Sequence, residues 1–212
     1  MTDYPSHRYL FDVRAGNLVD AQIFDKITAL DIADWKATWK PQIDEVVAGL
    51  VKKGVARHLW PQSHHWDWDN KAPSPGVIYE RGYAIRCQSR LQGLMVVNSV
   101  SGRCRISEQK GADCLYVEFI ESAPWNQPQY TSNPLFTLVG SVLIAAAIHQ
   151  SIDDGFGGRF ALHSLPQSNE WYADRLGMID LGPDPDRYQG RLNYFEATTE
   201  VAEKILNGVK FP

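Results

Sequence analysis

The stretch from Val139 to Met178 constrains the fold of this chain more than any other segment. Its first part, Leu138 to Ile148, is apolar except for Gly140 and Ser141, which predicts a helix covered on most of its sides. Glycines then end this helix, and Arg159 to Leu165 follows as a strand. A helix that leads into a strand packs as a crossover against one face of a sheet. The segment therefore predicts an α/β fold.

A second, shorter helix follows this strand. Ser168 or Asn169 can cap its N-terminus, and Gly177 stands where a residue with a positive φ angle ends a helix. Tyr172 lies near the start of the helix, next to Trp171. The segment as a whole is predicted to run helix, strand, helix.

The other predicted elements surround this segment. We expect the first quarter of the chain to be helical, over Asp31 to Lys40 and from Pro41 to Gly54, followed by a turn-rich segment from Trp60 to Gly76. Four strands and a closing helix complete the prediction, at Val77 to Cys87, Gly93 to Val100, Cys114 to Ile120, Gly190 to Ala197 and Thr199 to Asn207. Helices first, then strands, then a β-α-β-α-β order predict one α/β domain with a mixed sheet.

This order resembles the core of the GNAT superfamily, the acyl-CoA-dependent N-acyltransferases. The short helix of that family reads Tyr-x-x-x-x-Gly-Phe or similar, and Tyr172 to Met178 matches it here. The resemblance extends from Val77 to Glu196. It implies an α/β fold with a mixed, largely antiparallel central sheet flanked by helices, here with an N-terminal helical extension. We expect one GNAT-like domain over residues 1–212, with a helical and turn-rich part (1–76), a core (77–197) and a C-terminal helix (198–212).

The chain also resembles a set of bacterial GNAT-like proteins that share five short phrases. These phrases are HWDW, QGLM, APWN, LHSLP and YFE, which stand here at His65–Trp68, Gln92–Met95, Ala123–Asn126, Leu162–Pro166 and Tyr194–Glu196. The members of that set carry the GNAT name by similarity, without an established substrate.

The composition of the chain argues against several classes of binding partner. The 212 residues have a formal net charge of -4 at pH 7, which argues against an electrostatic nucleic-acid surface. No charged and then apolar leader opens the chain, and its longest apolar run is far short of the roughly 20 residues that a membrane span needs. Cys87, Cys104 and Cys114 are too few for a disulfide framework and lack metal-ligand spacing. We expect a soluble, cytoplasmic monomer or homodimer without a metal or a nucleic-acid or membrane partner.

The resemblance implies acetyl-CoA as co-substrate, held by backbone N–H groups at the start of the helix that begins near residue 139. The family's phrase there is Gln/Arg-x-x-Gly-x-Gly/Ala, whose three landmarks align with Leu135, Leu138 and Gly140. The expected cofactor-binding residues are Leu138, Val139, Gly140, Ser141 and Ser168. Bulk at Leu138 could obstruct a phosphate, and Gly140 could serve helix packing alone. The proline-containing loop from Ser122 to Thr137 could cover the pantetheine arm or replace it.

Amide formation from a thioester needs a base for the amine and an acid for the leaving thiolate. The resemblance gives Tyr172 the role of acid, whereas the alternative is an aromatic pair, Trp171 and Tyr172, that anchors a short helix. A glutamate on the strand before the helix is often the base. Glu121 and Glu118 are the candidates, and their spacing places them on opposite faces of a regular strand. We favour Glu121, which is nearer the end of the strand.

His163 and Ser164 suggest a hydrolase, but adjacent strand residues point to opposite faces and cannot act as base and nucleophile. The chain also lacks a Gly-x-Ser-x-Gly elbow. We therefore set a catalytic triad aside.

The segment from His64 to Asp69, HHWDWD, has the most unusual local composition. If it is extended, His65 shares one side with the aspartates, and Trp66 and Trp68 share the other. Three interpretations remain: a metal site, a substrate cleft with His65, Trp66 and Trp68 as substrate-binding residues, or tryptophans that fix a loop to the core. We favour the last.

Two functions follow from these observations. The first is an N-acyltransferase that moves an acetyl group from acetyl-CoA to a small-molecule or protein amine. The second is a non-catalytic binding module on the same scaffold with a degenerate cofactor site. The replaced glycines favour the second, while Tyr172 and Gly140 favour the first.

Overall fold

The computed structural model describes residues 7–74 and 76–208 of the chain. The chain forms two compact units. Unit 1 comprises Met1–Gly76, Arg81–Val96 and Phe119–Leu143, and unit 2 comprises Val77–Glu80, Val97–Glu118 and Ile144–Pro212. Strands β4 (Arg90–Arg103) and β5 (Asp113–Ser122) and helix α4 (Val139–Asp153) contribute residues to both units.

Unit 1 contains strands in the order β6-β1-β2-β3-β4-β5. Besides parts of β4 and β5, these are β1 (His7–Asp12), β2 (Asn17–Phe24), β3 (Glu80–Cys87) and β6 (Phe136–Thr137). β1 pairs antiparallel with both β2 and β6, and β2 pairs antiparallel with β3. The turn from β3 to β4 is formed by Gln88 and Ser89, both with positive φ angles, as a two-residue hairpin requires.

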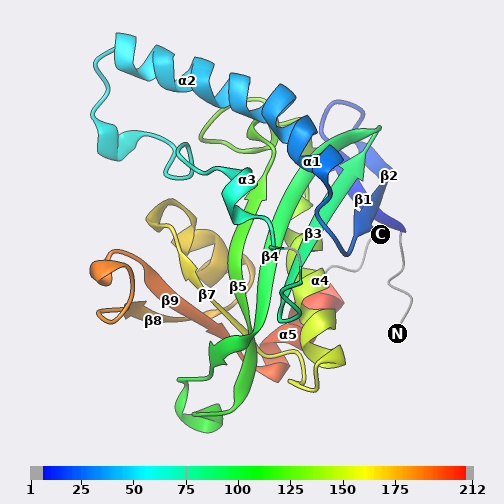
Figure 1. Cartoon of the computed structure of the whole chain (residues 1–212), viewed down its shortest axis with the longest axis vertical. Helices are drawn as coiled ribbons and strands as arrows, with labels where there is room; N and C mark the ends of the chain where they lie inside the picture. The colour runs from blue at the N-terminus through cyan, green and yellow to red at the C-terminus, as the bar shows by residue number, and fades with distance from the viewer. Residues whose placement is uncertain (1–6, 75, 209–212) are drawn as a thin grey trace. The chain divides into compact units, whose positions relative to one another are not determined.

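One long helix covers part of this sheet (Figure 1). It consists of α1 (Ala29–Asp34), a π-helical turn (Trp35–Trp39) and α2 (Lys40–Lys52). The N–H of Lys40 bonds to the carbonyl of Trp35, and this wider turn directly precedes Pro41. Proline has no N–H and clashes with the carbonyl four residues earlier, so the π-helical turn lets the helix continue through it. The two predicted helices are therefore one.

Buried aromatic residues attach this helix to the sheet. Trp35, Trp39 and Ile43 are buried in a hydrophobic cluster of unit 1. The rest of this cluster comes from β3, from β4, from the segment after β5 and from the segment before β3. Its buried residues there are Ala84, Leu91, Leu94, Val96, Ala123, Trp125, Tyr130 and Trp68. Five of the seven tryptophans of the chain thus lie in or against one cluster, counting Trp66 at its edge.

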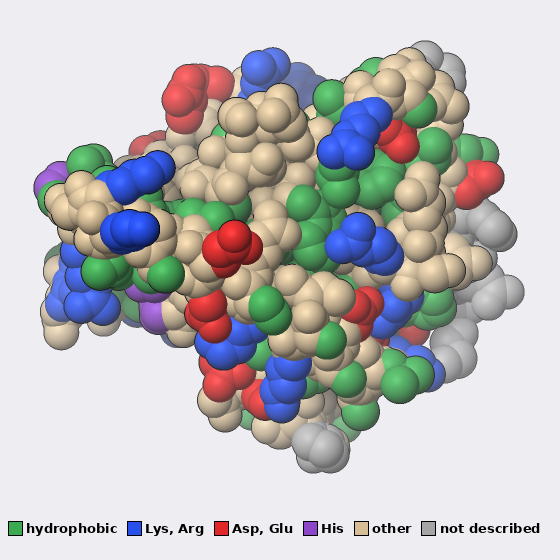
Figure 2. Space-filling model, turned by 90° about the horizontal axis from the view of Figure 1, so that it is seen from above, with side chains coloured by type: hydrophobic (Ala, Val, Ile, Leu, Met, Phe, Trp, Pro, Cys, Tyr) green, Lys and Arg blue, Asp and Glu red, His purple; other side chains and the backbone are tan. Residues whose placement is uncertain are grey.

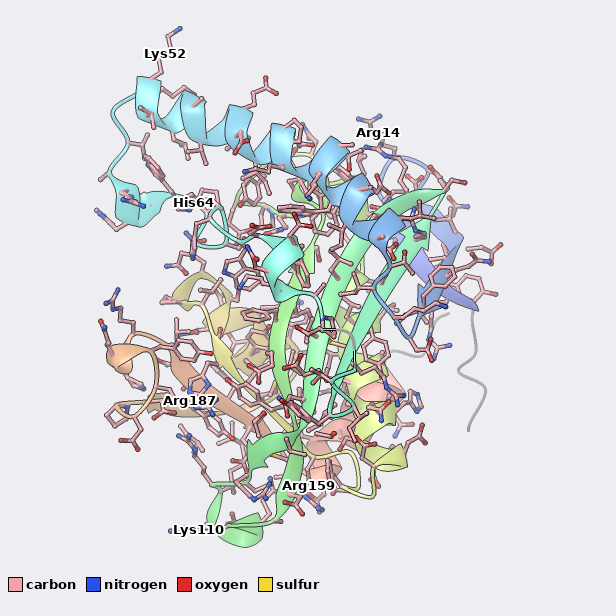
Figure 3. The ribbon with its side chains drawn as sticks, in the orientation of Figure 1. Arg14, Lys52, His64, Lys110, Arg159 and Arg187 are labelled. Atoms are coloured by element: carbon pink, nitrogen blue, oxygen red, sulfur yellow. The ribbon has the colours of Figure 1, made fainter. Side chains whose placement is uncertain are left out.

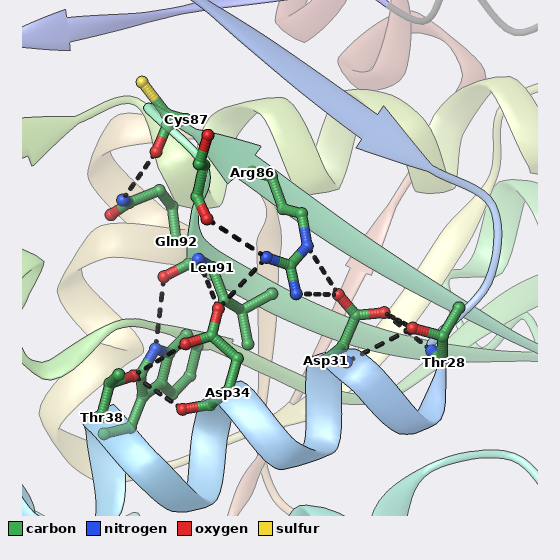
Figure 4. A network of polar contacts seen from close by, with 10 residues as sticks. Thr28, Asp31, Asp34, Thr38, Arg86, Cys87, Leu91 and Gln92 are labelled. Carbon is green, nitrogen blue, oxygen red and sulfur yellow. Dashed lines mark hydrogen bonds and ion pairs between the residues drawn. The ribbon is translucent and has the colours of Figure 1, made fainter.

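Polar contacts fix the same helix in position (Figure 4). Arg86 of β3 contacts Asp31 at 2.8 Å and Asp34 at 3.2 Å. Asp31 also completes a capping box with Thr28, and Asp34 accepts a hydrogen bond from the N–H of Leu91 at 3.1 Å. Because Asp31 is buried, its pairing with arginine offsets the cost of removing its charge from water.

Unit 2 contains strands in the order β4-β5-β7-β9-β8. Its further elements are β7 (Phe160–Ser164), β8 (Ile179–Pro183), β9 (Asn193–Ala197) and α5 (Thr199–Gly208). β5 and β7 run parallel and pair as far as Val117 opposite Leu162, while β9 pairs antiparallel with β7 and β8. Because α4 connects the parallel strands β5 and β7 along the chain, these elements form the crossover that the sequence predicts.

Short helical turns connect these elements. They are α3 (Trp68–Lys71), the π-helical turn Trp171–Arg175 and 3-10 turns at Arg57–Leu59, Ser107–Gln109, Pro124–Asn126, Pro166–Ser168 and Tyr188–Gly190. No helix among the described residues has both the length and the apolar composition to cross a bilayer.

The predicted fold class is confirmed: the sheet is mixed and largely antiparallel, with helices against it. The predicted helices before and after β7 are present, although the second is only a π-helical turn without a side-chain cap from Ser168 or Asn169. The expectation of a helical first quarter was incomplete, because β1 and β2 form a hairpin there. The sequence analysis also missed β6 and β8.

We predict that Gly93→Ala destabilises the protein by about 1–3 kcal/mol. A Cβ at Gly93 would lie 2.6 Å from Val139 Cγ1 and 3.1 Å from Leu143 Cδ1, so the first turn of α4 would have to move. Gly49→Ala is the matched control, because a Cβ there has no neighbour within 4 Å and alanine favours the helix by about 0.5–1 kcal/mol. Chemical unfolding of both variants measures the difference, and equal stabilities would contradict the close approach at Gly93.

Candidate functional site

The first turn of α4 offers backbone donors without a capping side chain. The first N–H groups of any helix have no hydrogen-bond partner within the helix. In α4 the first i to i−4 hydrogen bond joins the N–H of Val142 to the carbonyl of Leu138 at 2.9 Å. Leu138 precedes the helix with φ 74°, and its side chain, which cannot accept a hydrogen bond, is 37% exposed. The amides of Val139, Gly140 and Ser141 therefore form the part of the expected phosphate loop that can bind an anion.

The preceding amides are already used by the protein. The N–H of Leu135 bonds to the carbonyl of Trp125 at 3.0 Å, and the N–H of Phe136 bonds to Asn126 Oδ1 at 3.0 Å. Leu135 also packs against the aromatic cluster. The residue that aligns with the first landmark of the family's phrase is therefore partly buried against the core, and a diphosphate would depend on residues 138–141.

Gln92 of β4 anchors the loop from Ser122 to Thr137. Its side chain is buried, and its Oε1 accepts hydrogen bonds from Trp125 Nε1 and Asn126 Nδ2, each at 2.9 Å. Its carbonyl accepts a further bond from the N–H of Ala123 at 2.8 Å. These contacts fix the loop at the end of β5, so its path is set by β4.

Gly93, the next residue, joins the end of β5 to the first turn of α4. The position of its missing Cβ lies 2.6 Å from Val139 and 3.6 Å from the carbonyl oxygen of Glu121. The expected base and the expected cofactor-binding turn thus lie against the same glycine of unit 1. A larger residue at this position would separate them.

Glu121 is the most perturbed carboxyl group of unit 1. It is 5% exposed, and its Oε2 accepts a hydrogen bond from Trp68 Nε1 at 2.6 Å. Burial raises the pKa of Glu121 to about 7, against the opposing effects of Trp68, Ser63 and Lys71. A carboxyl group that changes charge near neutral pH can act as a proton acceptor there.

Unsatisfied polar atoms surround the same carboxyl group. Glu121 Oε1 and the hydroxyl of Tyr130 are buried and have no hydrogen-bond partner among the described residues. The hydroxyl of Ser63 is close enough to influence the pKa values of both groups but does not reach hydrogen-bond geometry with either atom. Leaving such atoms unpaired costs about 1–3 kcal/mol each. A polar ligand is one way to satisfy them.

The His64–Asp69 segment is not extended. Asp67 caps α3 by accepting a hydrogen bond from the N–H of Asp69 at 3.0 Å, and Asp69 pairs with Lys36. Trp68 is fully buried, and Trp66 lies edge-on against Phe119 with 5.6 Å between ring centroids. The favoured interpretation, tryptophans that fix the loop to the core, agrees with this packing. His65, Asp67 and Asp69 do not line one side as they would in an extended segment, because α3 starts at Trp68.

His65 differs from the two tryptophans. It is exposed, and its ring lies edge-on to that of His64, with 5.4 Å between the ring centroids. Figure 3 labels His64. Burial of part of the ring lowers its pKa, with His64 and Lys71 acting in the same direction. As a substrate-binding residue His65 stays a prediction.

In unit 2, Tyr172 lies in the π-helical turn and is buried. Its ring contacts Trp171 at 4.9 Å and Phe195 of β9 at 5.7 Å. Burial raises the pKa of its hydroxyl. The aromatic anchoring considered from the sequence is present, and the raised pKa keeps the phenol protonated at neutral pH.

Glu118 and Ser168 also belong to unit 2. Glu118 Oε1 accepts a hydrogen bond from Ser101 Oγ at 3.3 Å, and burial raises the pKa of this carboxyl group. Ser168 is half-buried in a 3-10 turn, where its N–H bonds to the carbonyl of Leu165. Neither contact assigns a role to these residues.

A buried polar network in unit 2 was missed by the sequence analysis. His163 Nε2 lies 2.7 Å from Asp184 Oδ2, and His163 Nδ1 lies 2.5 Å from the hydroxyl of Tyr116. Although burial alone would raise it, hydrogen bonds from Arg105 and His163 hold the pKa of Asp184 at about 2. Asp184 is therefore ionised, His163 Nε2 carries a proton, and Nδ1 accepts the hydroxyl of Tyr116.

This network joins β5, β7 and the segment after β8. Arg187, from the same segment as Asp184, lies over the ring of Tyr116, with 5.4 Å between the guanidinium carbon and the ring centroid. Ser164 instead bonds to the carbonyl of Leu165, in agreement with setting a triad aside. The sequence signal for the network is the aspartate between Pro183 and Pro185, which follows a strand directly.

Charges are mixed on the molecular surface. On the face seen in Figure 2, lysine and arginine side chains lie among aspartate and glutamate side chains without forming a patch of one sign. In addition, no group of three or more potential metal-ligating side chains occurs in the described part of the chain.

The predicted site residues fall into two groups. Leu138 to Ser141, Glu121 and the segment from His65 to Trp68 belong to unit 1, whereas Tyr172, Glu118 and Ser168 belong to unit 2. Within unit 1, Gly93 connects the helix turn with Glu121, and Trp68 connects Glu121 with the His64–Asp69 segment.

We predict that Glu121 makes stability depend on pH. Its folded pKa of about 7 exceeds the ordinary 4.5, so the folded protein binds more protons between these values and the free energy of unfolding falls as pH rises through them. Between pH 4.5 and pH 8, the free energy of unfolding of the native protein should fall by about 3 kcal/mol relative to that of Glu121→Gln. Unfolding by urea at several pH values measures this, with exposed Glu45→Gln as control. Parallel curves for the native protein and Glu121→Gln would refute it.

Comparison with solved structures identifies the fold. The GNAT domain of the S. lividans PAT is 14% identical to this chain, with a TM-score of 0.50 over 92% of this chain and 99% of that one. The PaiA N-acetyltransferase of Thermoplasma acidophilum in complex with coenzyme A is 11% identical, with a TM-score of 0.47 over 85% and 99%. The Bacillus subtilis N-acetyltransferase YlbP in complex with coenzyme A is 15% identical, with a TM-score of 0.47 over 85% and 97%.

These likenesses are structural. No protein-family model and no curated protein matches the chain. At 14% identity, the similarity to the S. lividans domain shows the fold alone. The chain has the GNAT fold.

Proposed function

We propose that this protein is an N-acyltransferase that moves an acetyl group from acetyl-CoA to an amine, either of a small molecule or of a protein. One observation carries the proposal beyond the fold. Glu121, with a pKa of about 7 and an unpartnered oxygen, belongs to the same compact unit as the open first turn of α4, and Gly93 touches both. A base and an anion-binding turn are two of the parts that such a transfer needs.

The amides of Val139, Gly140 and Ser141 would hold the diphosphate of the co-substrate. They carry the positive end of the α4 dipole, and no charged side chain lies in this turn. The co-substrate supplies an activated acetyl thioester. The residues of the chain then have to move protons and to position the amine.

Glu121 would accept the proton of the acceptor amine. Its raised pKa makes it a stronger base than an ordinary carboxylate, while a large fraction is still ionised at pH 7 to 8. Tyr172 would donate a proton to the leaving thiolate, a role that rests on the family resemblance. Its raised pKa keeps the phenol protonated, as an acid must be before the reaction. Glu118, with its own raised pKa, is the alternative base.

A non-catalytic binding module is the second candidate. The N–H groups of Leu135 and Phe136 favour it, because both donate hydrogen bonds within the protein and are not available to a ligand. Leucine at two of the three landmark positions also favours it. In this case the fold would bind a partner or ligand without group transfer. Measuring coenzyme A binding separates the two candidates.

We predict that the charge at position 138 controls coenzyme A binding. Asparagine and aspartate both tolerate a positive φ angle and can cap a helix, so Leu138→Asn and Leu138→Asp should both fold. Only aspartate adds a negative charge beside the proposed diphosphate. Calorimetric titration with coenzyme A should give a Kd at least tenfold weaker for Leu138→Asp than for Leu138→Asn. Equal values, or no heat for the native protein at millimolar coenzyme A, would exclude this site.

We predict that Glu121→Gln lowers kcat for transfer to a panel of amines by about 10²–10⁴-fold. In the native protein, kcat should rise with pH around an apparent pKa of about 7 as Glu121 loses its proton. Tyr172→Phe should lower kcat with little change in KM, and exposed Tyr79→Phe serves as its control. Thiol release at several pH values measures these rates. An unchanged rate in either variant would remove the role assigned to that side chain.

A further inference from the structure

Lys71 presents its amine to aromatic rings beside Glu121. It is the last residue of α3 and is half-buried. Its Nζ lies 3.4 Å from the ring centroid of Phe119 and 4.7 Å from that of Trp66. All of these residues belong to unit 1. An ammonium group over two ring faces is held by cation–π attraction and is partly removed from water.

The geometry of α3 and β5 brings this amine toward the carboxyl group. Trp68 and Lys71 are three residues apart and share one face of the helical turn. Phe119 and Glu121 are two residues apart and share one face of β5. Trp68 contacts Glu121 at 2.6 Å, while Lys71 contacts Phe119. The two pairs therefore meet side by side, which places the lysine amine and the glutamate on the same side of the strand.

The charges of the two groups influence each other. Burial lowers the pKa of Lys71, against the opposing effects of Glu121 and Asp67. Lys71 in turn acts to lower the pKa of Glu121, against the larger effect of burial. A lysine with a lowered pKa has a larger fraction of neutral amine at neutral pH, and only the neutral amine is nucleophilic.

We propose that Lys71 is itself an acetyl acceptor, so that the protein acetylates its own α3. This inference rests on the proposed function, because it takes acetyl-CoA as the donor and Glu121 as the base. In the reaction, the lone pair of Lys71 Nζ forms a bond to the thioester carbonyl carbon and the C–S bond breaks. The amine proton passes to Glu121, and the thiolate that leaves takes up a proton to give free coenzyme A.

Acetylation of Lys71 would also change the site. It removes the positive charge that lowers the pKa of Glu121, so this pKa should rise further and less of the base should be ionised at neutral pH. It also removes the cation from the faces of Phe119 and Trp66. The modified protein should therefore need a higher pH to transfer acetyl groups to other amines.

The experiment compares Lys71 with an exposed lysine of the same unit. The full chain is incubated with acetyl-CoA, and peptide mass spectrometry follows acetylation of Lys71 and of Lys36, whose side chain is half exposed in an ion pair with Asp69. We expect Lys71 to be acetylated at least tenfold faster than Lys36, and Glu121→Gln to slow only Lys71 by at least tenfold. Equal rates at both lysines, or no effect of Glu121→Gln, would indicate unassisted chemical acetylation and overturn the inference.

Two substitutions test the consequence of the modification. Lys71→Arg keeps the charge and blocks acetylation, whereas Lys71→Gln removes the charge. The pH profile of transfer to a small amine should shift to higher pH for Lys71→Gln and for protein acetylated beforehand, but not for Lys71→Arg or for the control Lys36→Gln. Coincident profiles for all four proteins would contradict the coupling between Lys71 and Glu121.

The pKa of the Lys71 amine can also be measured without coenzyme A. Competitive labelling with trace acetic anhydride from pH 6 to pH 11 reports the pKa of the Lys71 amine, which should lie below the ordinary lysine value of 10.5. The outcomes also separate the two proposals. Coenzyme A binding and transfer to small amines without labelled Lys71 would overturn this inference and leave the proposed function intact. Failure to bind coenzyme A would remove the proposed function, and the inference with it.

Discussion

The buried amide of Gln92 is the contact on which the candidate site depends. Its oxygen accepts hydrogen bonds from the side chains of both Trp125 and Asn126, and these bonds fix the path of the loop that follows β5. Asn126 in turn holds the N–H of Phe136, two residues before the turn that opens α4. Because a buried donor or acceptor without a partner costs about 1–3 kcal/mol, alternative paths of this loop are disfavoured. The open amides of α4 are thus positioned by one side chain of β4.

Five short phrases of the sequence each contribute a polar side chain to a buried or partly buried hydrogen bond. In unit 1, QGLM supplies Gln92, APWN supplies its two donors, and HWDW supplies the indole that bonds to Glu121. In unit 2, LHSLP supplies His163, and YFE supplies Glu196, whose carboxylate accepts the backbone N–H groups of Arg105 and Ile106. Such positions tolerate few residue types, since each substitution leaves a buried partner unpaired. The phrases therefore mark structural anchors, and only some of them lie at the candidate site.

Much of the fold could be predicted because strong local patterns agree with the tertiary structure. The apolar run of α4, the alternation along β5 and the glycines around both gave elements of the right type. The hairpin β1–β2 was missed because its polar side chains lack a clear alternation, and β8 because its side chains are mostly exposed. For the site, the family resemblance pointed to Glu121 as a candidate base. It could not give the raised pKa, which comes from burial beneath Trp68 and beside Tyr130.

The sequence by itself determined the element types, the α/β order and the chemistry available at each position, since these follow from periodicity, glycine placement and side-chain composition. Only the tertiary structure decided which polar groups lose water and which atoms remain unpaired. The contacts of Lys71 form only where α3 meets β5, and the pairing of His163 with Asp184 forms only where the segment after β8 meets β7. Desolvation depends on neighbours distant in the chain, so acid–base properties emerge only once the chain has folded.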